Sequence, residues 1–346
     1  MQQFSPEFTS KARLYLDSGR GVFIQPENYV PIPSKEVVPN FFSRLSSQYG
    51  IDVVKPHEAV RKDQEEVLAK ELIAGEPILL QGFWRTGQSS MIKALERRFG
   101  RANSIPLSFY VDGEHFNERK IPTDRKVFLG VEEILQLFDS DLKKIADLRA
   151  RENLMLLVSV QLHPGHDQRI AKAFTGFNTH FLRPLRREEV GILIRSPLVD
   201  SPVSVTDEAM DAIAEYCGGW PTAVKTFFQT FLYGWSSFTR WKEVYDADDV
   251  KSLTNRSPEE LFGSRFGHAL SHFARIYHEG IRPNQQNALD KIAAANELPI
   301  EKLDYEMIDV LIKTGLVVVT ADNQAYKING VFLRDLITSG FIQKIG

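Results

Sequence analysis

The residue types most suited to chemistry lie in the segment 77–93, which reads PILLQGFWRTGQSSMIK. Gly82 and Gly87 occupy the two glycine positions of the phosphate-binding pattern G-x-x-x-x-G-K-[ST], and Ser89 occupies its magnesium-binding hydroxyl position. Gln88 replaces the lysine of that pattern. Glutamine keeps a hydrogen-bond donor but loses the cation that faces the β- and γ-phosphates. The segment therefore predicts either a weakened phosphate-binding loop or an ordinary strand–turn–helix.

This loop lies within an alternation of apolar strands and amphipathic helices. The pattern predicts strands at 78–81, 105–111, 127–131, 154–160 and 178–182. The intervening helices are expected near 58–74, 89–99, 141–151 and 167–174. Such alternation predicts a parallel sheet with helices on both faces, an α/β fold, in which ligands bind beyond the carboxyl ends of the strands. The loop after the first strand lies at such an end.

The rest of the chain has a different pattern. Residues 185–265 are expected to be helical, with Thr206 as an N-cap and Pro221 in the first turn of a later helix. Residues 266–346 read as helices followed by two short strands, which indicates a winged helix-turn-helix. In the N-terminal segment 1–57, of unknown role, Ser34 is the candidate N-cap of a further helix.

Composition limits the class of protein. The 346 residues suffice for two or three domains, and the net charge of −3 gives no general electrostatic case for nucleic acid or membrane. Cys217 is the single cysteine, which excludes a disulfide within the chain and a cysteine zinc site. We find no apolar run near 18 residues and no signal peptide at the polar N-terminus, so we expect a cytoplasmic protein without a membrane partner.

In order and spacing, these features resemble the AAA+-related P-loop ATPases of the STAND and archaeal-type group. The resemblance covers roughly residues 58–346. Its further motifs are the strand 127–131 with Glu132-Glu133, the strand 154–160, and the segments 181–190, 218–221, 311–317 and 325–329. It implies a P-loop NTPase-like domain at 58–184, a helical lid at 185–265 and a winged helix domain at 266–346.

The resemblance also implies a site. ATP or ADP would be bound by the loop and by the lid proline, through Gly82, Arg85, Thr86, Gly87, Gln88, Ser89, Ser90 and Pro221. Mg²⁺ would be held by Ser89 and Glu132, and Glu133 would polarise the attacking water beside Glu132. The usual Asp-Glu pair is Glu132-Glu133 here, so both the metal-linked water and hydrolysis are affected.

Several of these residues have a plainer interpretation. Ser89 and Ser90 are equally suited to capping the following helix, and Glu132 and Glu133 to opening one, where the helix dipole favours acids. Arg85 either replaces part of the missing positive charge or is a solvated loop arginine.

The leading hypothesis is a degenerate nucleotide switch, at most a weak ATPase, that signals through its lid and winged helix. The alternatives are a pseudo-ATPase interaction scaffold and a DNA-associated regulator. Residues 266–346 carry 8 Lys and Arg against 9 Asp and Glu, a balance of −1, and the expected recognition helix 304–313 is acidic. Because DNA-reading helices are basic, we expect a protein partner or self-association rather than DNA.

Overall fold

The computed structural model describes residues 61–108, 121–195, 198, 204–229, 244–255 and 272–344. It divides into two compact units, which we describe separately. The sheet unit contains residues 61–184, 272–328 and the chain from 342. The helical unit contains residues 185–271 and 329–341. The predicted region 266–346 is thus divided between the two units, and the helix expected after Ser34 lies outside the described residues.

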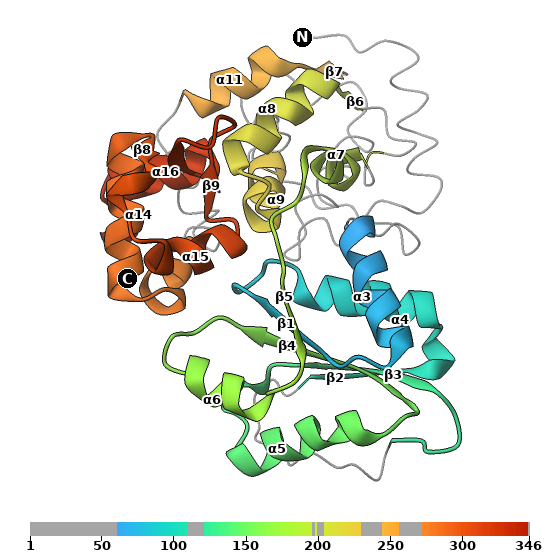
Figure 1. Ribbon diagram of the computed structural model, residues 1–346. Helices are drawn as coiled ribbons and strands as arrows, with labels where there is room; N and C mark the ends of the chain where they lie inside the picture. The colour runs from blue at the N-terminus through green and yellow to red at the C-terminus, as the bar shows by residue number, and fades with distance from the viewer. Residues whose placement is uncertain are drawn as a thin grey trace, which may run out of the picture. The chain divides into compact units, whose positions relative to one another are not determined.

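Five parallel strands form the centre of the sheet unit (Figure 1). They are β1 (Ile78–Gly82), β2 (Ser104–Ser108), β3 (Val127–Glu132), β4 (Leu154–Gln161) and β5 (Asn178–Phe181). Their order across the sheet is β2-β3-β4-β1-β5, so β1 lies between β4 and β5, with Gly82 opposite Gln161. The predicted α/β fold with a parallel sheet is confirmed.

Helices cover both faces of this sheet. Helices α3 (Lys62–Ala74) and α4 (Gln88–Phe99) share one apolar core with Met155 and Leu157 of β4. Helices α5 (Asp139–Asp147) and α6 (Asp167–Ala173) belong to the core on the other face. Successive residues of a strand point to opposite faces, which is why strands with two buried faces read as continuous apolar runs. Short 3₁₀ turns complete the layer at η1 (Arg101–Asn103), η3 (Ile134–Gln136) and η4 (Leu148–Ala150).

Helix α3 corrects one detail of the sequence pattern. Val67 and Ile73 are among the apolar residues of the predicted helix 58–74, yet they are 47% and 55% exposed. The buried stripe instead follows Glu65, Leu68, Ala69 and Leu72. That spacing of three, one and three residues defines one face of a helix, and Val67 and Ile73 fall outside it. The helix ends, as predicted, at Gly75, whose φ of 86° is left-handed.

The C-terminal part of the sheet unit contains a second, small sheet. The elements of this C-terminal part are η7 (Ile276–Gly280), α14 (Pro283–Ala295), β8 (Leu298–Pro299), η8 (Ile300–Lys302), α15 (Tyr305–Lys313), β9 (Val317–Val319) and β10 (Ala325–Ile328). The three strands are antiparallel in the order β8-β10-β9. The winged-helix interpretation of this part stays a prediction.

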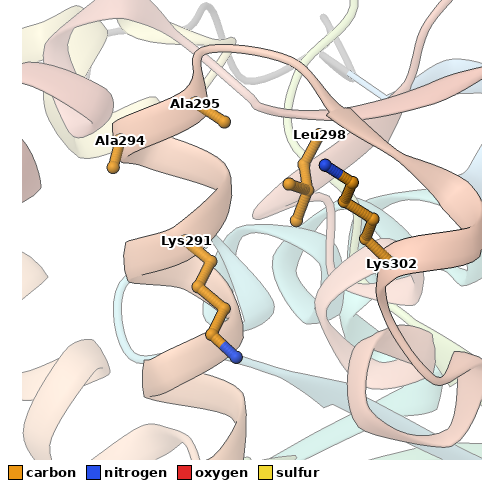
Figure 2. A pocket seen from close by; sticks show the side chains of 5 residues that line it. All are labelled: Lys291, Ala294, Ala295, Leu298 and Lys302. Atoms are coloured by element: carbon orange, nitrogen blue, oxygen red, sulfur yellow. The ribbon is translucent and has the colours of Figure 1, made fainter.

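An open groove of about 610 Å³ lies between α14 and the β8–η8 segment (Figure 2). Ala294, Ala295 and Leu298 make its lining mainly apolar, and Lys291 and Lys302 add two amines.

The helical unit is built from short helices and one pair of short strands. Its elements are α7 (Arg187–Arg195), β6 (Ser204–Val205), α8 (Asp207–Cys217), α9 (Pro221–Gln229), β7 (Val244–Tyr245), α11 (Ala247–Thr254) and α16 (Val331–Thr338). The short helix α17 (Phe341–Lys344) starts at the last residue of this unit, and its other residues belong to the sheet unit. Thr206 caps α8 by accepting a hydrogen bond from Ala209 N at 3.2 Å, and Pro221 begins α9, both as predicted. None of the helices in the described ranges is long and apolar enough to cross a membrane.

Gly130 of β3 allows a test of how closely α4 packs against the sheet. A Cβ at Gly130 would lie 2.7 Å from Ile92 Cγ2 of α4. We expect Gly130→Ala to destabilise the sheet unit by about 1–3 kcal/mol, the usual effect of overpacking a core. Gly191→Ala in α7 is the control, because its Cβ would make only an ordinary 3.9 Å contact with Met210. Thermal unfolding followed by circular dichroism compares the two. Equal melting temperatures of the two variants would contradict close packing of α4 against β3.

Candidate functional site

The loop of segment 77–93 lies at the carboxyl end of β1, between Gly82 and the start of α4 at Gln88. Its path depends on positive φ angles, 58° at Arg85 and 106° at Gly87. Gly82 is required for a different reason, because a Cβ there would lie 2.8 Å from the Thr86 hydroxyl. The two glycines of the predicted pattern therefore serve close approach at Gly82 and backbone conformation at Gly87.

Gln88 occupies the interior of the loop. Its side-chain amide donates to the carbonyl oxygens of Gly82 at 3.0 Å and Val160 at 3.4 Å. Its amide oxygen accepts from the Thr86 hydroxyl at 3.3 Å. The residue is 8% exposed. Glutamine thus fills the place of the missing lysine with a neutral group whose polar atoms are used within the protein.

A buried arginine supports the loop from the side. Arg61, just before α3, donates from Nη2 to the carbonyl of Thr86 at 2.8 Å and from Nε to the carbonyl of Arg183 at 3.1 Å. Its Nη1 lies so close to Gly87 that a Cβ there would come within 2.9 Å. Arg61 is 6% exposed, so its charge is fixed in the wall of the loop.

Ser89 and Glu132 meet although 43 residues separate them in sequence. The Ser89 hydroxyl donates to the Glu132 carboxylate at 2.5 Å. Helix α4 has Gly87 as its N-cap and no side-chain cap, so neither Ser89 nor Ser90 caps it. A hydroxyl beside a carboxylate suits Mg²⁺, which usually takes one or two carboxylates and completes its shell with water and substrate phosphates. No group of three or more ligating side chains is found in the described ranges, and such a site does not need one.

Glu133 lies next to Glu132 and faces Gln161 at the end of β4. Its carboxylate accepts from the Gln161 amide at 3.3 and 3.4 Å, and its φ of 62° is left-handed. Burial raises the pKa of Glu133, the charge of Glu132 raises it further, and Arg275 and Gln161 oppose the rise. Glu133 is the N-cap residue of η3 and makes no side-chain capping bond there, so its role as an acid at a helix start and its role beside the reacting water both stay predictions.

Aromatic and basic residues gather around the outer side of the loop. The Arg275 guanidinium lies 4.6 Å and that of Arg85 5.1 Å from the centroid of the Trp84 ring. His272 meets the same ring edge-on at 4.3 Å. Arg85 is exposed, which agrees with its interpretation as a solvated loop arginine. Pro221 belongs to the helical unit, and its predicted contact with nucleotide stays a prediction.

The fold resembles that of solved ATPases. The Walker-type ATPase PABY2304 of Pyrococcus abyssi superposes with a TM-score of 0.50 at 15% identity, over 81% of this chain and 96% of that chain. The RuvB Holliday junction branch migration motor of Thermotoga maritima gives 0.43 at 15%, over 78% and 90%. Drosophila ORC bound to DNA gives 0.44 at 12%, over 96% and 99%.

No protein-family model and no curated protein matches the sequence. The fold is an α/β fold of the P-loop NTPase type with a five-stranded parallel sheet, like that of the Walker-type ATPase. At such low identity the likeness is one of fold alone, and the scores below 0.5 for the RuvB and ORC structures carry no further weight.

The structure adds residues to the site that the sequence did not single out. One of them is Trp84, within the loop. The other two are Arg61, 25 residues before Thr86 in the sequence, and Arg275, in the C-terminal part of the sheet unit. Neither spacing nor composition marks them, because their contacts depend on the folded chain. The use of the predicted residues in binding nucleotide, magnesium or water remains a prediction.

The raised pKa of Glu133 makes stability depend on pH. A carboxyl whose pKa is higher in the folded state favours folding below its unfolded pKa and loses that contribution as pH rises through the folded pKa. We therefore expect Glu133→Gln to raise the melting temperature at pH 7.5 and to lose this advantage as the pH falls toward 4.5. Thermal melts across this range are the measurement.

Glu66→Gln is the control for Glu133→Gln, because Glu66 is 55% exposed and pairs with Lys70 on the surface of α3. An advantage of Glu133→Gln that is the same at every pH would show that charge burial is not its cause.

Proposed function

We propose that this chain is a nucleotide-binding switch protein of the AAA+ type, related to the STAND group, that binds ATP or ADP with Mg²⁺ and hydrolyses ATP weakly or not at all. The observation that carries the proposal is the bond between Ser89 and Glu132. It joins the hydroxyl after the loop to the acid at the end of β3, the two groups suited to a shared magnesium ion. Binding would be signalled through the helical lid and the C-terminal elements.

The loop supports phosphate binding through its backbone. The first N–H groups of a helix lack partners within the helix, and the helix dipole favours an anion beside them. Helix α4 begins at Gln88 with no acidic residue in its first turn. Gly87, with its φ of 106°, provides the left-handed backbone conformation that turns the chain into this helix. What this loop lacks is the lysine charge, so we expect weak affinity and still weaker catalysis.

One observation favours the second candidate, an interaction scaffold with an empty site. The Gln88 amide already satisfies the carbonyl of Gly82, so the loop holds its shape without a ligand. The third candidate, a DNA-associated regulator, has less support. Asp309 of α15 pairs with Lys313 at 2.6 Å, which neutralises the lysine that we expected on a recognition helix. We therefore favour a protein partner or self-association.

Restoring the lysine separates a switch from a scaffold. We expect Gln88→Lys to tighten ATP binding by about tenfold or more, equivalent to about 1.4 kcal/mol, because it returns a cation to an otherwise suitable cradle. Calorimetric titration of magnesium–ATP into both forms measures this. Gln324→Lys, the same change in the exposed turn between β9 and β10, is the control for added charge. If Gln88→Lys binds no better than the unchanged chain, the loop is not shaped for phosphate and the scaffold is favoured.

Hydrolysis gives an independent test. We expect turnover far below the typical enzyme value of about 10 per second, because the lysine is absent and the acid pair is altered. Phosphate release by the unchanged chain and by Glu133→Gln measures it. Release at ordinary enzyme rates that Glu133→Gln abolishes would make the chain a working ATPase and contradict the proposal.

A further inference from the structure

Residues 272–280 contact the first two residues of the loop that follows Gly82. Phe83, the first residue after Gly82, is 1% exposed and packs against Gly280, where a Cβ would lie 3.2 Å from its ring. Trp84 follows, with His272 at its edge and Arg275 over its face. Two successive loop residues are thus held by a segment nearly 200 positions away, within the same unit.

Arg275 lies directly against the loop, with its guanidinium 4.6 Å from the centroid of the Trp84 ring. Its charge also lowers the pKa of Glu133. The Trp84 ring fixes the guanidinium, since an arginine over an aromatic face is attracted by the ring and keeps its donors available. Arg275 also pairs with Glu279 at 2.8 Å, with the two side chains 46% and 52% exposed. Such an exposed pair is weak and can rearrange.

The other arginines near the loop are less suited to meet a phosphate. Arg61 is buried, and its donors bond the carbonyls of Thr86 and Arg183. The Arg85 guanidinium lies farther from the same ring, at 5.1 Å against 4.6 Å for Arg275. Arg275 combines partial exposure, a close contact with a loop residue and a charge that lowers the pKa of Glu133.

We propose that Arg275 supplies the cation that the loop lacks at Gln88, so that residues 272–280 complete the site for the polyphosphate of a nucleoside di- or triphosphate. The ligand phosphates would take the guanidinium from Glu279 and hold it beside Trp84. Because Arg275 directly precedes the π-helical turn η7 and then α14, occupancy of the loop would be passed to the C-terminal elements. This inference rests on the proposed nucleotide binding.

The test compares ligands that differ in phosphate content. ATP, ADP and adenosine are titrated calorimetrically into the full chain and into Arg275→Gln, Arg275→Lys and Glu279→Gln. We expect Arg275→Gln to weaken ATP and ADP binding about tenfold and leave adenosine unchanged, Arg275→Lys to retain most of the affinity, and Glu279→Gln to tighten ATP binding by releasing Arg275. Arg98→Gln is the matched control, because Arg98 is 42% exposed and pairs with Glu65 elsewhere in the same unit. Circular dichroism melts check folding.

Three results would overturn the inference. Unchanged ATP affinity in Arg275→Gln would show that Arg275 does not meet the phosphates. An equal loss for ATP and adenosine would assign Arg275 a packing role. In a Gln88→Lys background the effect of Arg275→Gln should shrink, since one cation replaces the other, and a full-sized effect there would show that the two are independent. Absence of ATP binding in both the unchanged chain and Gln88→Lys is a different failure, because it removes the proposed function and this inference with it.

Discussion

The hydrogen bonds of the Gln88 amide are the constraint on which the site depends. A lysine ammonium can only donate, and in a phosphate-binding loop it faces an anion. Glutamine both donates and accepts, so its amide ties the end of β1 at Gly82 to the end of β4 at Val160 and takes a bond from Thr86. The polar groups of the Gln88 side chain are therefore hydrogen-bonded within the protein, without a ligand. Helix α4 starts at the same residue, and this start brings Ser89 to Glu132.

This arrangement leaves the charges of the site unbalanced. Glu132 and Glu133 lie together at the end of β3, and burial, followed by the charge of Glu132, raises the pKa of Glu133. A bound phosphate would add negative charge at the same place. Positive charge would then come from a metal ion or from the arginines in and around the loop, since Gln88 is neutral. A site of this kind binds anions only as well as its surroundings permit, which agrees with the weak turnover that we propose.

The fold and the core of the site could be predicted because their signals are local. Alternating strands and helices gave the parallel sheet, and the spacing of Gly82, Gly87 and Ser89 marked the loop. The positions of Arg61 and Arg275 could not be predicted, because contacts across 25 or more residues leave no periodic signal. The exposure of Val67 and Ile73 shows that a local apolar signal alone does not predict burial. Both are apolar, but their place on the helix turns them away from the buried stripe.

Phe83 and Trp84 give the proposed switch a physical basis. In a phosphate-binding loop, the backbone N–H groups and the residues around the second glycine contact the phosphate. The positions directly after the first glycine are variable, so their side chains can make contacts elsewhere in the protein. Here they carry two large aromatic side chains, and both contact residues 272–280. Packed aromatic contacts do not deform continuously, because interiors are close-packed. A ligand that changes the path of the loop must therefore move the segment 272–280 or break its contacts. In the proposed switch, either event would change the start of the C-terminal elements, so a loop that hydrolyses ATP poorly would still transmit the presence of its ligand.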